Sequence, residues 1–206
     1  MTKEEKINIL KETIEWKPDI PQALEKLGCK VGIEIGVRMA GNLKNLATNP
    51  KFKEGMLYGL DCWTEDPDKP EINDANYTQS DLDKQYWGCV AMFSSNPFVK
   101  IVRNYSYEGS LDFPDNYFDF IYIDAAHDYD SMVEDINAWW PKLKEGGIFS
   151  GHDYFPDKRI WRGKACEVYR AVNEFAASQN TEVHHVTSTE KEGGPGVACN
   201  SFFIVK

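Results

Sequence analysis

Phe118-Asp-Phe-Ile-Tyr-Ile-Asp124 is the stretch of this sequence that decides the fold, because it is strongly apolar, barely alternates and ends on an aspartate. Similar apolar runs occupy residues 30–35, 56–61, 99–102 and 147–150, and helical patterns separate them. Strands this apolar are typical of a parallel sheet that is covered by helices on both faces. We therefore predict an α/β fold built on a doubly wound, mostly parallel sheet.

The last part of the chain predicts two further strands, which would bring the sheet to seven. Residues 182–186 and 201–205 are strand-like, and the Gly-rich turn 192–196 joins them. A Gly-containing connection between two such runs is typical of a β-hairpin. The predicted sheet thus ends with an antiparallel C-terminal hairpin strand.

Two short helices are predicted ahead of the first strand. Ile7, Leu10 and Ile14 stand at helical spacing, and a second helix is expected from Pro21, which suits a first turn, to Gly28, which suits a helix end. We expect residues 1–28 to form a helical cover on an edge of the sheet, with no chemistry of its own.

Two longer helices are predicted in the second half of the chain. The first follows Asp124, with Ser131 and Glu134 as a capping box, and its apolar face extends to Leu143. The second is expected over residues 164–178, with Cys166, Tyr169, Val172 and Phe175 facing inward.

Residues 62–97 interrupt this alternation of strands and helices. The first half of the segment is polar and contains prolines, and the second half predicts a helix through Tyr86, Val90 and Phe93. Insertions of this length in a compact domain are usually functional. We expect a lid-like segment, with a purely decorative surface insertion as the alternative.

The composition narrows the classes of function. A formal net charge of -10 opposes binding to phosphate backbones and anionic lipids, so nucleic acids and membranes are not expected as partners. No apolar run approaches the roughly 20 residues of a bilayer crossing, and the first residues lack the apolar region of a secretory signal. Five scattered cysteines without a C-x-x-C pair are typical of reduced thiols. We expect one cytoplasmic domain over residues 1–206.

Two strand ends carry the residue types of a nucleoside site. Gly36 follows the strand that contains Glu34, and a small residue there lets a ligand approach the backbone closely, with simple close packing of the chain as the alternative. The dinucleotide fingerprint G-x-G-x-x-G is absent because Arg38 occupies its second glycine position, which disfavours a nicotinamide enzyme. Asp61 ends the next strand, where a carboxylate can accept hydrogen bonds from both hydroxyls of a ribose. The alternative for Asp61 is a helix cap or a loop carboxylate.

The most specific signal is Tyr122-Ile-Asp124-Ala-Ala-His127-Asp-Tyr129, followed by Gly146-Gly-Ile-Phe-Ser-Gly-His152-Asp153. Together with the Glu-x-Gly turn and the Asp at the second strand end, these segments resemble the class I S-adenosylmethionine-dependent methyltransferases. The chain looks most like the small-molecule O-methyltransferases of the macrocin and sugar-methylating type, over about residues 30–206. The resemblance implies a Rossmann-like fold with S-adenosylmethionine as the cofactor.

The resemblance also implies roles for individual residues. Glu34 and Gly36 would hold the methionine end of the cofactor, and Asp61 would hold its ribose. Ser106 stands where the family contacts adenine. Asp124 would lie beside the sulfonium.

His127 is the candidate general base, because a histidine can remove a hydroxyl proton near neutral pH. Catechol-type members of the family have a lysine at this place and an Asp-Asn pair later in the chain, whereas here Tyr154 follows Asp153. We expect Mg²⁺ or another divalent cation between Asp124 and Asp153, without a clear third ligand. The alternatives are that His127 only anchors the following helix and that Asp153 only orients His127. His152 is expected to orient Asp153 or to meet the substrate.

The resulting prediction is a methyltransferase that acts on a hydroxyl of a small molecule, for which a sugar or glycosylated metabolite is one candidate. The alternatives are a nitrogen or phenolic acceptor, and a non-catalytic module that binds S-adenosylmethionine or another nucleoside. The expected partner is a small-molecule acceptor, and a homo-oligomer is left open.

Overall fold

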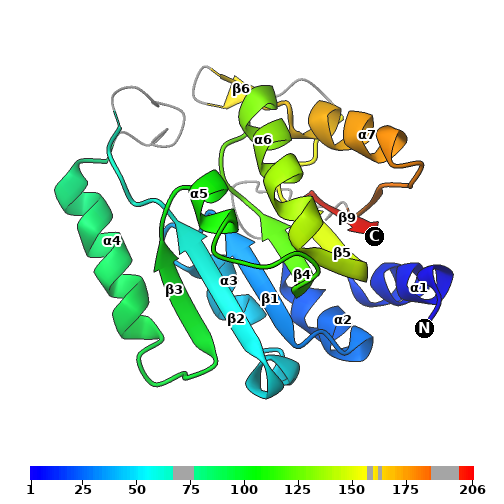
Figure 1. The fold of residues 1–206 in the computed structure, drawn as a ribbon, viewed down its shortest axis with the longest axis horizontal. Coiled ribbons are helices and arrows are strands. Elements are labelled where there is room, and N and C mark those ends of the chain that lie inside the picture. Colours follow the sequence, from blue (N-terminus) through cyan, green and yellow to red (C-terminus); the bar gives the residue numbers. More distant parts are fainter. Residues whose placement is uncertain (67–76, 157–159, 162–163, 187–199) are drawn as a thin grey trace.

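A seven-stranded sheet forms the centre of the molecule in the computed structural model, which describes residues 1–66, 77–156, 160–161, 164–186 and 200–206 (Figure 1). Its strand order is β3-β2-β1-β4-β5-β9-β8. The strands of this sheet are β1 Val31–Ile35, β2 Met56–Asp61, β3 Val99–Arg103, β4 Phe118–Ile123, β5 Leu143–Gly151, β8 His184–Val186 and β9 Ser201–Val205. A separate two-stranded ribbon consists of β6 Ile160–Trp161 and β7 Lys164–Ala165.

The pairing within the sheet confirms the predicted fold class. Strands β1 to β5 pair in parallel, whereas β9 runs antiparallel to both β5 and β8. Every residue of β9 is buried, as are the last four residues of β1. The apolar strands therefore form an α/β sheet that is covered on both faces, and β8 with β9 is the predicted C-terminal hairpin. The turn 192–196 lies outside the described residues.

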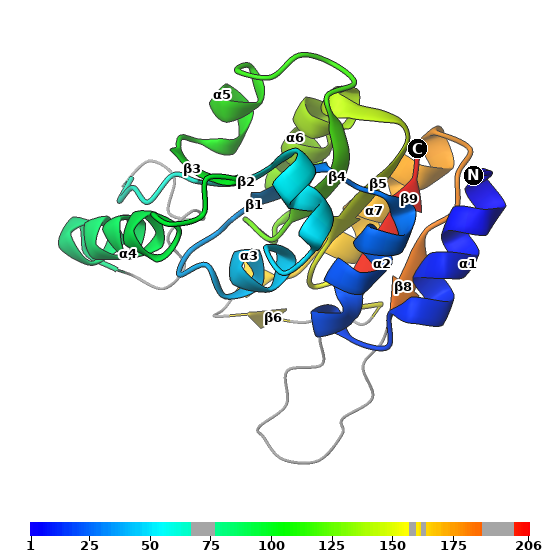
Figure 2. The ribbon, with the colours of Figure 1, turned by 90° about the horizontal axis from the view of Figure 1, so that it is seen from below.

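Helices cover both faces of the sheet, and Figure 2 shows α5 and α6 on one side with α3 and α4 on the other. The α-helices are α1 Lys3–Thr13, α2 Ile20–Leu27, α3 Gly41–Leu46, α4 Gln79–Met92, α5 Ser106–Ser110, α6 Tyr129–Trp139 and α7 Val168–Ser178. In the described parts of the chain, 3-10 helices occur at η1 Lys17–Asp19, η2 Pro50–Glu54 and η4 Trp140–Lys142. None of the helices in the described part of the chain has both the length and the apolar character that a membrane crossing needs.

Two apolar cores result, one on each face of the sheet. The first joins α1 to α4 with the sheet residues Leu57, Phe120 and Phe203. The second joins α6 and α7 with Ile33 and Phe149. Because the N-terminal helices α1 and α2 contribute to the first core, they are part of the folded domain.

Helix α6 begins earlier than predicted. Asp128 is its N-cap and accepts a hydrogen bond from the backbone N–H of Ser131 at 3.0 Å, so the predicted capping box of Ser131 with Glu134 is wrong. Both aspartate and serine are good N-caps, and the earlier one adds nearly a turn to the helix. The helix also ends earlier, since Leu143 begins β5 after the short η4.

Helix α7 begins at Val168 instead of residue 164. The residues before it make contacts with the sheet loops: the Glu167 N–H donates to the His127 carbonyl at 2.8 Å, and the Cys166 thiol donates to the Asp153 carbonyl at 3.4 Å. These tertiary contacts override the helical pattern. Tyr169 is 37% exposed, which contradicts its predicted inward position.

The interrupting segment 62–97 contains the predicted helix, which is α4. Residues 67–76 of its polar half lie outside the described residues. Hydrogen bonds tie the described part to the turn after β1. The Trp63 indole N–H donates to the Arg38 carbonyl at 2.9 Å, and the Arg38 guanidinium donates to the Tyr77 hydroxyl at 2.8 Å.

Candidate active site

The carboxyl ends of β1, β4 and β5 meet at one place. The Asp124 N–H donates to the Ile35 carbonyl at 2.8 Å, and the His152 N–H donates to the Ile123 carbonyl at 3.0 Å. The strand order reverses between β1 and β4, and open α/β sheets bind ligands at such a switch point. The candidate residues of three separate motifs therefore share one edge of the sheet.

Gly36 allows the turn after β1 to lie directly against the chain that leaves β4. Its φ is +87°, and a Cβ atom there would stand 2.0 Å from the Asp124 carbonyl oxygen and 2.8 Å from the Ala125 Cα. No side chain fits in that space. The expected need for a small residue at Gly36 is thus explained by a close approach of two backbone segments at the site.

Glu34 is a buried acid near the end of β1, two residues before Gly36, and is 1% exposed. Its Oε1 accepts a hydrogen bond from the Asn42 amide at 2.9 Å. Its Oε2 and the Asn42 Oδ1 are both buried, and neither has a hydrogen-bond partner among the described residues. Burial raises the pKa of Glu34 to about 8. A ligand ammonium beside Glu34 and Asn42 would favour the ionised carboxylate and supply the missing donor, and that is the charge at the methionine end of the expected cofactor.

Asp61 is oriented by the backbone on both of its oxygens. Oδ2 accepts from the Arg38 N–H at 2.8 Å, and Oδ1 accepts from the Trp63 N–H at 2.9 Å. Burial raises the pKa of Asp61, although these backbone hydrogen bonds lower it in part. A carboxylate oxygen accepts more than one hydrogen bond, so both oxygens retain capacity for the hydroxyls of a ribose.

Ser106 lies at the start of α5, and its hydroxyl faces α6. It donates to Asp135 and accepts from the Trp139 indole N–H at 2.9 Å. Burial raises the pKa of Asp135 to about 7, although the Ser106 hydrogen bond lowers it in part. These contacts give the Ser106 side chain a role in joining α5 to α6, and its contact with adenine stays a prediction.

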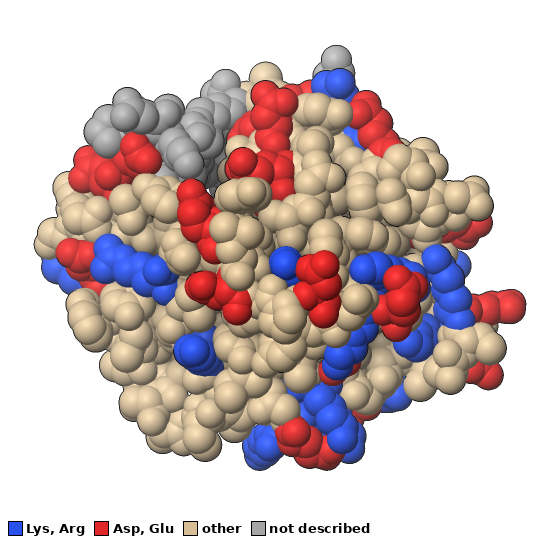
Figure 3. All heavy atoms as spheres, in the orientation of Figure 1, with Lys and Arg blue, Asp and Glu red and all other residues tan. Residues whose placement is uncertain are grey.

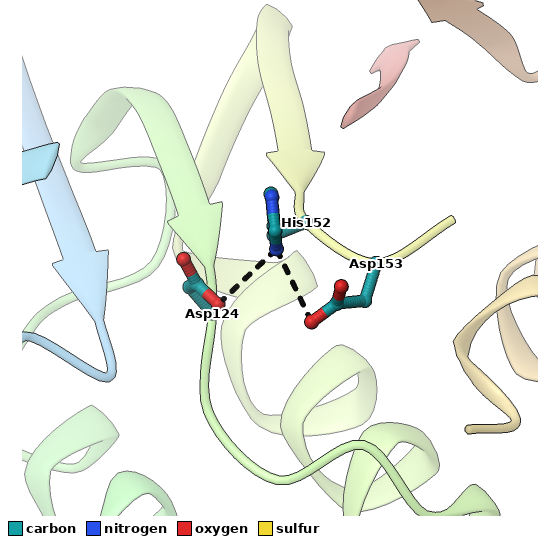
Figure 4. A group of neighbouring side chains, drawn as sticks. All are labelled: Asp124, His152 and Asp153. Carbon is teal, nitrogen blue, oxygen red and sulfur yellow. Dashed lines mark ion pairs between the residues drawn. The ribbon is translucent and has the colours of Figure 1, made fainter. Parts of the chain in front are cut away.

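Asp124, His152 and Asp153 form a cluster in which one ligand atom from each residue lies within 4.8 Å of the others. Figure 4 shows the two carboxylates turned toward the imidazole from the ends of β4 and β5. His152 Nδ1 lies 3.1 Å from Asp153 Oδ2 and 3.7 Å from Asp124 Oδ1. The expected convergence of the two carboxylates is present. His152 is a third side chain that could ligate a metal ion, and the sequence analysis did not assign it that role. Its position directly before Asp153 in the sequence could have indicated it.

His127 pairs with the same carboxylate, since its Nε2 lies 2.8 Å from Asp153 Oδ2. Burial raises the pKa of Asp153, but the hydrogen bonds from His127 and His152 outweigh this and hold the pKa below its ordinary range. Asp153 itself has a left-handed backbone, with φ of 55°. An ionised Asp153 therefore faces two imidazoles, through His127 Nε2 and His152 Nδ1.

Lys17 also belongs to this site. Its ammonium is 2.9 Å from Asp124 Oδ2 and 5.2 Å from the centre of the Tyr122 ring. The N-terminal segment therefore contacts the site, because η1 brings a cation to a strand-end carboxylate; the expectation that residues 1–28 carry no chemistry of their own stays a prediction. Lys17 and Asp124 are 107 positions apart, and no motif in the sequence connects them.

Charged side chains of both signs share the surface. On the face shown in Figure 3, the described Lys and Arg residues are interspersed with Asp and Glu and do not form a continuous basic surface. The exclusion of nucleic acids as partners stays a prediction.

Comparison with known proteins identifies the family of this chain and finds solved structures with a similar fold. A family model described as a methyltransferase domain matches residues 29–154. No curated protein matches the chain. An O-methyltransferase from Bacillus cereus, solved in complex with SAH, is 14% identical with a TM-score of 0.64, over 92% of this chain and 80% of that one.

Two other solved structures show how widely this fold is used. The O-methyltransferase NovP is 12% identical with a TM-score of 0.63, over 92% of this chain and 77% of that one. Spermidine synthase from Thermotoga maritima is 19% identical with a TM-score of 0.58, over 88% of this chain and 55% of that one. At these identities the likenesses show the fold alone. Because the family match extends over more than half of the sequence, this chain belongs to the methyltransferase domain family and is a class I S-adenosylmethionine-dependent methyltransferase.

Proposed function

We propose that the enzyme methylates a hydroxyl oxygen of a small molecule, with a sugar or glycosylated metabolite as the acceptor class. The observation that carries this proposal is the pairing of His127 with Asp153 at 2.8 Å, beside Asp124 at the carboxyl end of the sheet. An aliphatic hydroxyl is a poor nucleophile until its proton is removed. A histidine–carboxylate pair at this position suits that task.

In this proposal His127 is the general base. Nε2 lies against the Asp153 carboxylate at 2.8 Å, so in this proposal Nδ1 is the imidazole nitrogen that takes the acceptor's proton. The low pKa of Asp153 keeps it ionised, and the negative charge stabilises the imidazolium once the proton has moved. Asp153 thereby orients His127 and also supports its charge.

The other residues hold and align the reactants. S-Adenosylmethionine, when bound, supplies a methyl group on a sulfonium. Glu34 and Gly36 would receive its methionine end, Asp61 its ribose and Ser106 its adenine, while Asp124 lies beside the reacting centre. Transfer of a methyl group is an in-line displacement, so alignment of the acceptor oxygen supplies much of the rate acceleration.

Segment 62–97 is proposed as a lid over the cofactor. Support comes from the hydrogen bonds of Trp63 and Tyr77 to Arg38, which belongs to the turn after Gly36. A divalent cation, Mg²⁺ or another, is proposed at Asp124 and Asp153, with His152 as the third protein ligand. Two carboxylates and one imidazole within 4.8 Å suit such an ion. A cytoplasmic location, and a homo-oligomer as an open alternative, stay predictions.

An acceptor screen tests the proposal. The enzyme is incubated with S-adenosylmethionine and a panel of sugars, glycosides, catechols and amines, and formation of S-adenosylhomocysteine is measured. Hydroxyl acceptors should give product, and His127→Ala should lower turnover by roughly 10²–10⁴-fold while the cofactor affinity stays unchanged.

Each other outcome has a defined meaning. Product from amines alone would refute the hydroxyl acceptor. Wild-type turnover in His127→Ala would refute the base and favour a structural histidine. Tight binding of S-adenosylmethionine without product from any acceptor would favour a binding module.

A further inference from the structure

The Lys17 side chain places a positive charge beside the Asp124 carboxylate, which is proposed to bind a metal ion. Its Nζ lies 2.9 Å from Asp124 Oδ2, while His152 Nδ1 lies 3.7 Å from the other oxygen, Oδ1. The Lys17 side chain is 17% exposed and the Asp124 side chain 22%, so water only partly screens the pair. Asp124 therefore already has a cation from the chain itself.

The backbone around Lys17 holds it at this position. One Asp19 oxygen, Oδ2, accepts hydrogen bonds from the N–H groups of Glu15 and Trp16, each at 3.1 Å. The Asn45 amide donates to the Lys17 carbonyl at 3.3 Å, which ties η1 to α3. The lysine is therefore delivered by a defined turn that is fastened to the body of the domain.

We propose that the Lys17 ammonium and a divalent cation compete for Asp124, so that the N-terminal segment controls how tightly the site holds metal. This inference rests on the metal site of the proposed function. An ion bound to Asp124 would stand close to a fixed positive charge, and repulsion between partly buried like charges is strong. Metal binding thus requires Lys17 to leave Asp124 or proceeds at reduced affinity.

Binding of Mn²⁺, measured from the electron paramagnetic resonance signal of the free ion, tests the competition without any methyl acceptor. Lys17→Met should tighten Mn²⁺ binding by about tenfold or more, because the competing charge is gone. Lys17→Arg keeps the charge and should bind Mn²⁺ like the wild type. Lys26→Met is the matched control, since Lys26 also lies in the N-terminal segment but its ammonium donates to Thr13 at 3.0 Å.

A second substitution locates the effect. Adding Asp124→Asn to Lys17→Met should abolish the gain in affinity, and thermal unfolding of each variant confirms that it is folded. The proposal is overturned if Lys17→Met binds Mn²⁺ no more tightly than the wild type, if neither protein binds it, or if Lys26→Met or Lys17→Arg gains as much.

The acceptor screen separates failure of this inference from failure of the proposed function. Unchanged Mn²⁺ affinity in Lys17→Met, together with S-adenosylhomocysteine formation by the wild type, would refute the competition and leave hydroxyl methylation standing. A gain in Mn²⁺ affinity in Lys17→Met without product from any acceptor would support the competition and refute hydroxyl methylation.

Discussion

Replacing Gly36 by alanine should disrupt the site and the fold together. The new Cβ atom would lie 2.0 Å from the Asp124 carbonyl oxygen and 2.5 Å from its carbonyl carbon, both of which are backbone atoms that cannot rotate away. Overpacking of this kind costs about 1–3 kcal/mol, and a left-handed alanine adds about 1–2 kcal/mol. We expect the free energy of unfolding to fall by about 2–5 kcal/mol.

Gly28 provides the matched control. Its φ of +73° is close to the +87° of Gly36, but nothing lies within 4 Å of the position that a Cβ would take. Gly28→Ala should therefore carry only the backbone cost, about 1–2 kcal/mol. The difference between the two variants isolates the clash with Asp124 from the left-handed backbone.

Urea unfolding followed by tryptophan fluorescence measures both variants, and calorimetry with S-adenosylmethionine measures the site. Gly36→Ala should lose cofactor affinity because the turn moves away from Asp124, whereas Gly28→Ala should retain it. Equal destabilisation of the two variants, with cofactor binding preserved in both, would refute the close approach of the turn to the strand end.

Three other outcomes are expected. Asp61→Ala should weaken S-adenosylmethionine binding by about one to two orders of magnitude in calorimetry, since charged hydrogen bonds contribute about 1.5–3 kcal/mol each; unchanged affinity in the folded variant would refute the ribose assignment. Burial raises the pKa of Asp135 to about 7, so its contribution to stability is full below its unfolded pKa and is lost as the pH rises toward 7. The free energy of unfolding of Asp135→Asn should not show this decrease with rising pH, which amounts to about 1.4 kcal/mol per unit of pKa difference between the folded and unfolded states. If the wild type and the variant gave parallel curves of unfolding free energy against pH, the raised pKa of Asp135 would be contradicted. Chelation should abolish turnover, with Mg²⁺ restoring it in the wild type but not in Asp153→Asn; full activity in chelator would refute the metal site.

The strands were the part of the fold that could be predicted best. Strand β2 has the predicted bounds, because its apolar run packs against both cores, with Leu57 in one and Leu60 in the other. The first residues of α6 and α7 were predicted less accurately than the strands. Asp128 and Ser131 are both good caps, so tertiary contacts decide between them, and such contacts also replace the first residues of the expected α7 by a short ribbon.

Some residues of the candidate site could also be predicted from the sequence, and others could not. Parallel strands end at a common edge, so the approach of Asp124 to Asp153 follows from strand order alone. Lys17 could not be found by this reasoning, because it reaches Asp124 through the docking of a separate turn. The contact depends on where the N-terminal segment packs, and hydrophobic spacing does not specify that.

The contact between Lys17 and Asp124 crosses the boundary of the family match, which begins at residue 29. A shortened chain cut at that boundary would retain Glu34, Asp61 and Asp124, yet it would lack the residue that neutralises one of them and the buried face of α1 and α2. Under the proposed competition at Asp124, the affinity for a divalent cation depends on a residue outside the matched region, so a change there would alter it with every motif inside the match left intact.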